Sequence, residues 1–311
     1  MTRKHIALVG CGAWGSNILR DLRELGCDVT VVARSAASIE RARVGGATAI
    51  VPTIGALPAV EGAVVATLAT AHAEVCHELL DRGLSVFCEK PLTVDLAEAR
   101  ALDARADGRL FVMDKWRYHG GVEALRDLAR SGELGHPVGL VTVREQWGSP
   151  HRDVDTVWVH VPHDLAIAFE ILGPLGPVVG AVAERIEGRV AGLQGTLGRA
   201  PWVTISHSTA APATRRMFRL VCEGGTATLA DSHDEALLVA SGVPERGSAP
   251  QPRPFDPEWP LRKELRAFLA HLDGGPAPRS SSACHLALLE RLVDLRHAAG
   301  LDGRPPADVS R

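Results

Sequence analysis

Short apolar runs alternate with amphipathic segments over residues 1–118 of the chain. Apolar runs bounded by turn residues indicate buried strands, and the segments between them have helical periodicity. This alternation predicts a parallel sheet wrapped by helices. The expected strands are His5–Val9, Asp28–Ala33, Gly62–Ala66, Ser85–Cys88 and Leu110–Val112, and the expected helices begin near Ala13, Ala36, Ala71 and Asp95.

The pattern changes from Gly121 onward, where a helix through Ser131 precedes longer alternating runs. These runs predict a second domain, residues 119–311, with an open and mostly antiparallel sheet. The expected strands are Pro137–Gln146, Val178–Glu187, Trp202–Ser208, Met217–Val221 and Ala227–Ala230. The proline-rich stretch Gly242–Pro260 predicts a surface loop, followed by helices near Leu261–Leu272 and Ser281–Ala298.

Composition narrows the class of protein. Hydrophobic residues make up 46% of the chain and charged residues 23%, as expected of a packed globular protein. The net charge of −3 provides no broad positive field, so neither nucleic acid nor a membrane is an expected partner. The first strand begins by His5 and no long apolar run follows, which favours a cytoplasmic protein. The six scattered cysteines are expected to be buried, reduced thiols.

A glycine-rich turn follows the first expected strand, in the order Gly10, Cys11, Gly12, Ala13, Trp14, Gly15. In a dinucleotide-binding turn the first glycine permits the tight bend and the second lets the backbone approach a pyrophosphate. The third allows close packing of helix and strand, while free amides at the helix start attract the anion. The position between strand and helix predicts a nicotinamide dinucleotide site, although the spacing alone also suits a structural turn.

The second strand ends without the acidic residue that would bind the ribose of NAD, since Arg34 and Ser35 stand there. A guanidinium and a hydroxyl could instead hold the additional phosphate of NADP. NADP is therefore the preferred cofactor and NAD the alternative. A solvated surface arginine is the alternative interpretation of Arg34.

The sequence Glu89-Lys90-Pro91 ends another apolar strand, on the side of the sheet where ligands of doubly wound folds collect. Partial desolvation and a nearby cofactor charge would lower the lysine pKa from about 10.4 toward a catalytically useful range. Lys90 is thus a candidate acid-base residue. The alternative is a surface salt bridge between Glu89 and Lys90.

Taken together, these motifs resemble the glucose-fructose oxidoreductase, inositol dehydrogenase and MocA family of NAD(P)-dependent oxidoreductases. The matching segments are Gly10–Gly15, Glu89-Lys90-Pro91, and Pro162-His163-Asp164-Leu165 with its apolar helix to Gly173. Thr67 with His72 and Glu74, and Arg117-Tyr118-His119, match more weakly. The order and spacing fit over residues 5–173.

The resemblance implies a Rossmann domain, a C-terminal α/β domain whose sheet mediates a homodimer or homotetramer, and an active site between them. Lys90 would bind the reacting oxygen and His163 would contact the substrate or relay the proton. A cis bond before Pro91 is also implied. The remaining residues implied or suggested near the cofactor or substrate are Gly10, Gly12, Ala13, Trp14, Gly15, Arg34, Ser35, Thr67, His72, Glu89, Arg117, Tyr118 and His160.

Two positions depart from the family pattern. Val159 stands where many carbohydrate-active members have an aspartate, and Gly120 or Gly121 replaces a proline. The expected reaction is hydride transfer between nicotinamide and a hydroxyl or carbonyl carbon of a sugar, sugar nucleotide or cyclitol. Val159 keeps open the reduction of an imine or a conjugated double bond. A non-catalytic cofactor sensor is the competing class.

Imidazoles and carboxylates near residue 160 also suggest a metal site, formed by His151, Asp153, His160, His163 and Asp164. No metal is expected, because Pro162 suits the first position of a helix, which would leave His160 outside that helix. Trp147, Trp158 and Trp202 could line a substrate pocket or pack in the core.

Overall fold

A computed structural model describes residues 3–149, 154–242 and 249–301. Its internal contacts form two compact units. Unit 1 contains the chain up to Lys115 together with Trp259–Ala287, and unit 2 contains Trp116–Glu258 and the chain from Leu288 onward. Residues 259–287 were expected in the second domain, and they join unit 1 because the apolar side of their helix packs on the first sheet.

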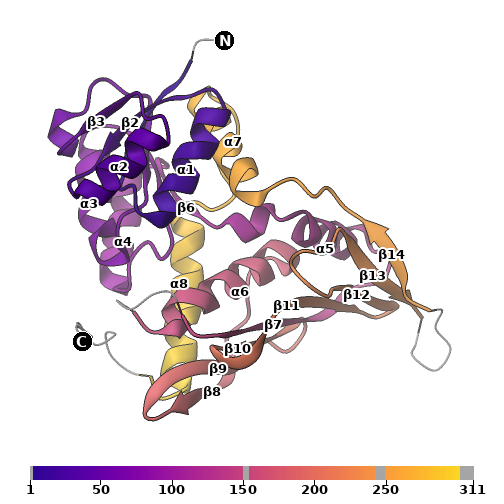
Figure 1. The fold of residues 1–311 in the computed structure, drawn as a ribbon. Coiled ribbons are helices and arrows are strands. Elements are labelled where there is room, and N and C mark those ends of the chain that lie inside the picture. Colours follow the sequence, from indigo (N-terminus) through magenta and orange to yellow (C-terminus); the bar gives the residue numbers. More distant parts are fainter. Residues whose placement is uncertain (1–2, 150–153, 243–248, 302–311) are drawn as a thin grey trace. The chain divides into compact units, whose positions relative to one another are not determined.

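The described part of unit 1 contains a six-stranded sheet with the order β3-β2-β1-β4-β5-β6, and every neighbouring pair is parallel. Helices separate the strands along the chain (Figure 1). The strands are β1 His5–Val9, β2 Asp28–Val32, β3 Ala49–Val51, β4 Gly62–Val65, β5 Ser85–Glu89 and β6 Leu110–Met113. The helices are α1 Ala13–Glu24, α2 Ala36–Val44, α3 His72–Asp81, α4 Leu96–Ala106 and α7 Pro260–Leu272, with short 3₁₀ helices at Ile54–Ala56 and Ala69–Ala71. This is the Rossmann arrangement that the sequence predicted.

Hydrophobic clusters cover both faces of this sheet. Leu8 and Phe87 point to one face and Ala7 and Val86 to the other, as alternation along a strand requires. Phe268 of α7 stacks on Phe87 with ring centroids 5.1 Å apart. The carboxyl ends of the strands are therefore held on a rigid core, and the candidate site residues follow those ends.

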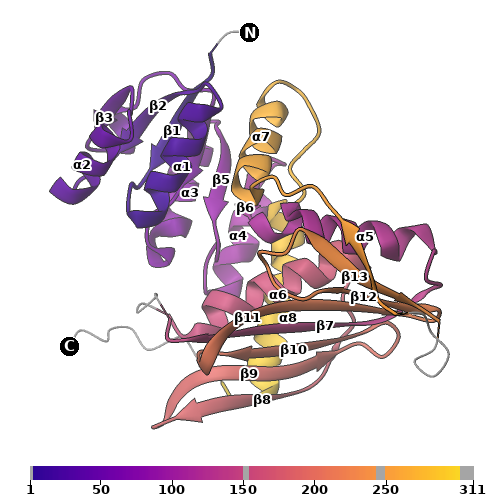
Figure 2. The ribbon, with the colours of Figure 1, turned by 45° about the vertical axis from the view of Figure 1, so that its right-hand side comes forward.

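The described part of unit 2 contains an eight-stranded sheet with the order β14-β13-β12-β11-β7-β10-β9-β8 (Figure 2). The strands are β7 Pro137–Trp147, β8 Val178–Ile186, β9 Arg189–Leu197, β10 Trp202–Ser208, β11 Ala210–Cys222, β12 Gly225–Leu229, β13 Ala236–Ser241 and β14 Gln251–Pro254. Only the β7–β10 pair is parallel among these described strands, so the expected mostly antiparallel sheet is confirmed.

Two helices of unit 2 matter for the site. They are α5 Gly120–Ser131 and α6 Thr156–Leu172, which pack on each other, and α6 also contacts β7, β9 and β10. A 3₁₀ helix at Lys115–Tyr118 precedes α5, and α8 Ser282–Ala298 ends the described secondary structure. Nearly every side chain of α6 is buried, so this helix forms the centre of the core of unit 2.

Several strands were missed in the sequence pattern for physical reasons. Strand β3 has only three residues, and β9 contains Gly192, where a Cβ atom would lie 2.2 Å from the carbonyl oxygen of His207. A glycine in a strand reads as a loop although close backbone approach requires it here. Strand β14 lies within the predicted proline-rich loop, and its prolines are tolerated because it is an edge strand. Residues 243–248 of that loop lie outside the described residues.

None of the helices in the described ranges has the length and hydropathy of a membrane-spanning segment. Five of the six cysteines, all of which lie in the described chain, are buried: Cys11, Cys27, Cys76, Cys88 and Cys222. Cys284 is partly exposed. The expected burial of the thiols therefore holds for all but Cys284.

Candidate functional site

The glycine turn between β1 and α1 has the geometry that a dinucleotide loop requires. Gly10 has φ of 94°, and a Cβ atom there would lie 2.6 Å from the carbonyl oxygen of Ala66. A Cβ atom at Gly15 would lie 2.5 Å from the carbonyl oxygen of Gly10. At Gly12, in contrast, no described atom lies within 4 Å of that position. Gly10 and Gly15 are thus required by the fold, whereas Gly12 borders open space.

Gly12 is also the N-cap of α1, and no side chain caps the helix there. The amides of the first turn therefore remain available for an anion, to which the helix dipole adds a positive field. Ala13 and Trp14 begin the helix, and its first turn has no acidic residue. A dinucleotide pyrophosphate fits these groups, because it needs amide donors and room beside a glycine backbone.

Arg34 and Ser35 follow β2, as the sequence indicated. Arg34 is exposed, and its Nε lies 3.4 Å from the carbonyl oxygen of Pro52. Ser35 is the N-cap of α2, where its hydroxyl oxygen accepts a hydrogen bond from the Ser38 amide at 3.2 Å. The guanidinium is accessible to a phosphate, while the serine hydroxyl already stabilises a helix end.

Thr67 and His72 join the end of β4 to the turn after β5. The His72 ring is buried, with Nδ1 at 2.7 Å from the Pro91 carbonyl oxygen and Nε2 at 3.2 Å from the Thr67 carbonyl oxygen. His72 therefore fixes the backbone on both sides of the predicted cofactor site. The buried ring favours this positioning role over direct contact with the cofactor.

Glu89, Lys90 and Pro91 stand at the carboxyl end of β5, and the Lys90–Pro91 bond is cis, as the family resemblance implied. The Lys90 amide donates a 3.1 Å hydrogen bond to Oε2 of Glu89. Oε1 of Glu89 accepts a hydrogen bond from the indole of Trp14. Burial raises the pKa of Glu89, although Lys90 and the Trp14 hydrogen bond act in the opposite direction. Trp14 thus connects the glycine turn with the Glu89-Lys90 pair.

Four further residues of unit 1 surround this pair, and sequence reasoning missed them. Asp114 and Lys115 follow β6, and the ammonium of Lys115 lies 4.5 Å from the centroid of the Trp14 indole. Glu264 of α7 is fully buried, and Nδ1 of His285 lies 3.9 Å from Oδ2 of Asp114. A polar residue after an apolar strand, or within the apolar stripe of a helix, is the signal that could have identified them.

Arg117 and Tyr118 are buried in unit 2. Nε of Arg117 donates a 2.9 Å hydrogen bond to Glu170, whose other oxygen accepts one of 2.9 Å from Arg126. This ion pair favours a structural role for Arg117 over contact with a substrate. The glycine that replaces the family proline is also explained, because a Cβ atom at Gly120 would lie 1.9 Å from the carbonyl oxygen of Asp256.

Both candidate histidines lie inside α6, which corrects the expectation that Pro162 begins this helix. The helix begins earlier because Asp155 caps it, accepting hydrogen bonds from the amides of Val157 and Trp158. Pro162 is an interior residue, so His160 and His163 are three positions apart in one helix and share a side of it. Val159 is buried in the same helix.

The surroundings of the two histidines are aromatic and cationic. Trp116 meets the His163 ring edge-on, with centroids 6.5 Å apart, and the Arg144 guanidinium lies 4.9 Å from the Trp116 ring. Arg144 forms a buried ion pair with Asp164, at 3.0 Å from Nη2 to Oδ1. Asp164, the residue that follows His163, is therefore anchored to β7 through Arg144.

His160 packs on His207 of β10, with ring centroids 4.9 Å apart. Nδ1 of His207 donates to the Arg144 carbonyl oxygen at 3.2 Å, and the Thr156 hydroxyl lies 2.7 Å from Nε2. Burial lowers the pKa of His207 to about 4. The imidazole is therefore neutral at physiological pH, with Nε2 accepting from Thr156.

The structure brings together Gly10–Gly15, Thr67, His72, Glu89 and Lys90 in unit 1, and His160 and His163 in unit 2. No group of three metal-ligating side chains occurs in the described residues, while His151 and Asp153 lie outside them. Trp158 is buried, Trp147 is exposed and Trp202 is partly buried. Trp158 therefore packs in the core.

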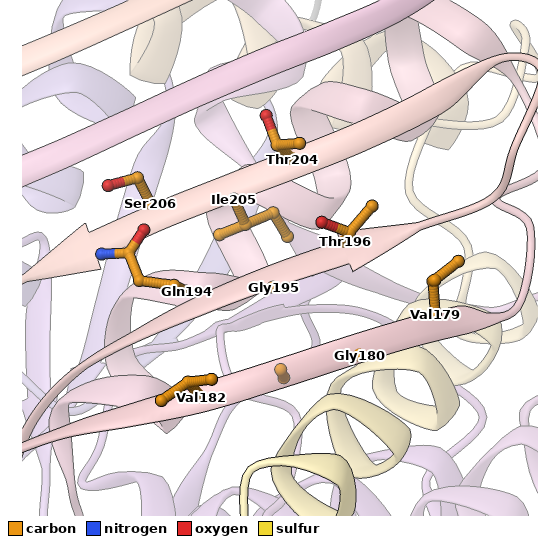
Figure 3. Close-up of a pocket in the computed structure, with 10 residues that line it drawn as sticks. Val179, Gly180, Val182, Gln194, Gly195, Thr196, Thr204, Ile205 and Ser206 are labelled. Carbon is orange, nitrogen blue, oxygen red and sulfur yellow. The ribbon is translucent and has the colours of Figure 1, made fainter.

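A hollow of about 660 Å³ lies on β8, β9 and β10 of unit 2 (Figure 3). Figure 3 shows that Gln194, Ser206 and Val182 belong to three adjacent strands, and their backbones are paired in register. Val182 is 68% exposed. This hollow contains none of the predicted site residues, so it is separate from the motifs described above.

Comparisons with known proteins agree with these motifs. A family model described as an oxidoreductase family with an NAD-binding Rossmann fold, Gfo/Idh/MocA, matches residues 4–112. An inositol 2-dehydrogenase of Streptomyces avermitilis is 30% identical over 182 residues, which cover 54% of this chain and 53% of that protein. A D-apiose dehydrogenase of Paraburkholderia graminis is 25% identical over an alignment covering 96% of this chain and 88% of that protein. The chain thus matches about half the length of the first relative and most of the second.

Solved structures share the whole fold. The UDP-N-acetylglucosamine 3-dehydrogenase GnnA from Acidithiobacillus ferrooxidans has a TM-score of 0.83 at 20% identity, covering 96% of this chain and 98% of that one. An oxidoreductase from Agrobacterium radiobacter, in complex with NAD+, L-tartaric acid and magnesium, has a TM-score of 0.85 at 16% identity, covering 98% of each chain. With the family model matching over β1 to β6 and the glycine turn and Glu89-Lys90-Pro91 in place, residues 4–112 match the NAD-binding Rossmann domain of the Gfo/Idh/MocA oxidoreductase family.

Proposed function

We propose that the protein is an NAD(P)-dependent dehydrogenase that exchanges a hydride with a hydroxyl or carbonyl carbon of a small polar substrate. A sugar, a sugar nucleotide or a cyclitol is the proposed substrate class. The observation that carries this proposal is the hydrogen bond from Trp14 to Glu89, because it joins the glycine turn to the residue beside Lys90. The names of the relatives, which include inositol, apiose and sugar-nucleotide dehydrogenases, support the substrate class.

A bound nicotinamide dinucleotide would supply the hydride acceptor or donor. The amides of the first turn of α1 would hold its pyrophosphate, and the open space at Gly12 would admit it. Gly10, Ala13, Trp14 and Gly15 would complete the turn. Thr67, His72 and Glu89 would form the adjoining side of the cofactor site, with His72 acting through the backbone.

Lys90 and His163 are the proposed acid-base residues. Lys90 would donate a hydrogen bond to the reacting oxygen and move its proton, since its ammonium offers three donors. His163 would contact the substrate or relay the proton, because imidazole titrates near neutral pH. His160, on the same side of α6, would contribute to this part of the site, whereas burial makes Arg117 and Tyr118 supporting residues.

NADP is the proposed cofactor in preference to NAD. The exposed guanidinium of Arg34 at the end of β2 supports this preference, because arginine presents a planar set of donors to a phosphate. Titration of the purified protein with NADPH and NADH tests it. NADPH should bind more tightly and lose that advantage in Arg34→Ala, while tighter binding of NADH would contradict the proposal.

A second candidate is the NADPH-dependent reduction of an imine or a conjugated double bond. The buried apolar Val159, in place of an ionisable residue, favours it. A substrate panel distinguishes the two candidates through the absorbance of the reduced nicotinamide. Turnover of polyols, ketosugars or sugar nucleotides without turnover of imines or enones supports the first candidate, and the reverse supports the second.

Lys90→Met tests whether the protein is an enzyme at all. The variant should retain cofactor binding and lose at least about a hundredfold in turnover, which is the usual contribution of a general acid-base group. A cofactor sensor that signals to a protein partner would keep its function in this variant. Unchanged turnover would remove Lys90 from the mechanism.

Two accompanying proposals concern the state of the protein in the cell. A homodimer or homotetramer would use the outer face of β8–β10, where Val179, Val182 and Ile186 are exposed. A cytoplasmic location would give access to the NAD(P) pool. Light scattering in solution tests the first proposal and cell fractionation tests the second.

A further inference from the structure

Glu264 is a buried carboxyl group to which the proposed reaction gives no role. Its exposed fraction is 0%, and within the described chain neither of its carboxyl oxygens has a hydrogen-bond partner. An ionised carboxylate without a partner is costly to bury, and such groups are rare in folded proteins. Its presence within the apolar side of α7, between Leu261 and Leu265, therefore needs a physical explanation.

The packing of α7 brings Glu264 to the end of the parallel sheet. Phe268, one helical turn later, stacks on Phe87 of β5 at 5.1 Å and meets Phe111 of β6 edge-on at 6.4 Å. Glu89 lies two residues beyond Phe87, and Asp114 lies three residues beyond Phe111. The carboxyl groups of Glu264, Glu89 and Asp114 consequently gather where β5 and β6 end.

Three other groups complete this buried acidic cluster. Asp114 is 1% exposed, and the nearly buried His285 lies 3.9 Å from it. Lys115 and Lys90 supply positive charge at the ends of β6 and β5. Three carboxyl groups thus share a site at the ends of β5 and β6 with these cationic side chains.

The proton is retained mainly by Glu264. Burial, reinforced by the charges of Glu89 and Asp114 and opposed by Lys115, raises the pKa of Glu264 well above its usual value. Glu89 has counteracting partners in Lys90 and Trp14, and Glu264 has no hydrogen-bonding partner in the described residues. Neighbouring carboxyl groups titrate as a coupled pair, and the one with cationic and hydrogen-bonding partners ionises first. The surroundings therefore favour the charge on Glu89 and the proton on Glu264.

We infer that Glu264 is a positioning residue for Lys90 and that it acts through Glu89. The inference rests on the proposed function, which assigns Lys90 to the reaction. As a neutral group Glu264 adds no second negative charge near Glu89. Glu89 then remains ionised and continues to hold Trp14 and the Lys90 amide. An ionised Glu264 would instead shift a proton onto Glu89 and weaken both contacts.

Infrared spectroscopy of the cofactor-free protein tests the protonation state. The wild type should show the carbonyl band of a protonated carboxylic acid at pH 7, and Glu264→Gln should lose it. Glu40→Gln is the matched control, because Glu40 is an exposed residue of unit 1 that forms an ion pair with Arg43. The band should persist in this control. An acid band of unchanged intensity in Glu264→Gln would overturn the inference.

The Trp14 indole reports on the coupling to Glu89. The chain has six tryptophans, so their indole N–H signals can be resolved by nuclear magnetic resonance, and Trp14→Phe identifies the one from Trp14. In the wild type this signal should shift as Glu264 loses its proton with rising pH. This step should be absent in Glu264→Gln, and its persistence there would show that Glu264 does not act on Glu89.

Turnover provides the third readout. The informative quantity is the pH profile of turnover, because Glu264→Gln replaces an acid that can ionise with an amide that cannot. Above the pH of the Trp14 step the wild type should lose activity that the variant retains. If Glu264→Gln fails to fold, pH titrations of the wild type still test the inference. The loss of the infrared acid band and the shift of the Trp14 signal must then have the same midpoint pH. Neither spectroscopic test needs catalysis, so failure of the Lys90→Met test would overturn the proposed function alone.

Discussion

The indole Nε1 of Trp14 donates a hydrogen bond to Oε1 of Glu89, which joins the glycine turn after β1 to the end of β5. Lys115 lies over the same indole, 4.5 Å from its centroid. Trp14 is 37% exposed, so this contact stands at the surface of unit 1 where a ligand can reach it. The loop predicted to bind the cofactor and the carboxylate beside the predicted acid-base residue therefore share one contact.

Trp14→Phe should separate the two parts of this site. The phenyl ring keeps an aromatic surface under Lys115 but cannot donate to Glu89, whose pKa should rise because that hydrogen bond lowers it. Loss of a hydrogen bond to a charged group at a partly exposed position predicts a cofactor affinity about two- to tenfold weaker. Titration with reduced cofactor measures this change. Trp147→Phe is the matched control, since Trp147 is 76% exposed in unit 2. The Trp147→Phe protein should bind the cofactor with wild-type affinity.

Gly12→Ala should weaken cofactor binding without unfolding the protein, whereas Gly10→Ala should destabilise the fold itself. A methyl group at Gly12 meets no described atom within 4 Å. The free energy of unfolding of Gly12→Ala should therefore lie within about 0.5 kcal/mol of the wild-type value. The same methyl occupies the space proposed for the pyrophosphate, and cofactor affinity should fall by about tenfold or more. Gly10→Ala combines φ of 94° with a 2.6 Å approach to Ala66 and should destabilise by about 2 kcal/mol or more.

Thermal unfolding and cofactor titration of both variants provide the measurement. Gly26→Ala separates the two effects of Gly10, because Gly26 also has a positive φ but no described neighbour within 4 Å of its Cβ position. Normal cofactor binding by Gly12→Ala would contradict the dinucleotide assignment.

Sequence patterns predicted the Rossmann unit well because its strands are short, continuous and buried on both faces. Strand β1 has the predicted bounds, His5–Val9, and the glycines of the turn carry their function in their spacing. The patterns failed where tertiary packing decides the outcome. Pro162 suggested a helix start, but the cap at Asp155 sets the beginning of α6 six residues before it.

The acidic cluster could not be predicted from local patterns. Glu264 and Asp114 are far apart in the sequence, and each alone is compatible with a solvated surface position. Only the packing of Phe268 on Phe87 brings α7 to the end of β5 and buries the glutamate. Arg117 illustrates the same limit, because its motif indicated a substrate contact and its burial beside Glu170 indicates an ion pair.

His207 should make stability depend on pH. Its folded-state pKa of about 4 lies below the value of about 6.5 for an unfolded chain, so between these values only the unfolded protein binds the proton. The stabilising contribution is present above about pH 6.5 and is lost as pH falls toward 4, by about 3 kcal/mol across the whole window. Unfolding midpoints measured from pH 4.5 to 7.5 should therefore rise with pH.

His207→Gln should reduce that slope, because an amide does not titrate in this range. The exposed His233 provides the control, and His233→Gln should leave the slope as in the wild type. An equal slope in His207→Gln would assign the acid sensitivity to other groups.

Arg117→Gln should affect folding more than substrate binding. The side chain is 6% exposed and its Glu170 partner 5%, so removing the guanidinium leaves a buried carboxylate with fewer partners. Breaking a buried ion pair from one side costs about 3–5 kcal/mol. Arg126→Gln is the matched comparison, because Arg126 also contacts Glu170 and is 15% exposed. This substitution should lower the free energy of unfolding by less than Arg117→Gln does. Denaturation and KM measured together distinguish the roles, since a raised KM at unchanged stability would return Arg117 to the substrate site.

Val182→Asp should dissociate the proposed oligomer. Val182 is 68% exposed on β8, in the row that continues through Gln194 of β9 and Ser206 of β10. A carboxylate buried at an interface loses its hydration without gaining a partner, so subunits that meet through this face should separate. Val44→Asp provides the control, because Val44 is 78% exposed on α2 of unit 1. Light scattering should give a smaller mass for Val182→Asp and an unchanged mass for Val44→Asp. An unchanged mass for both would exclude this sheet face as the interface.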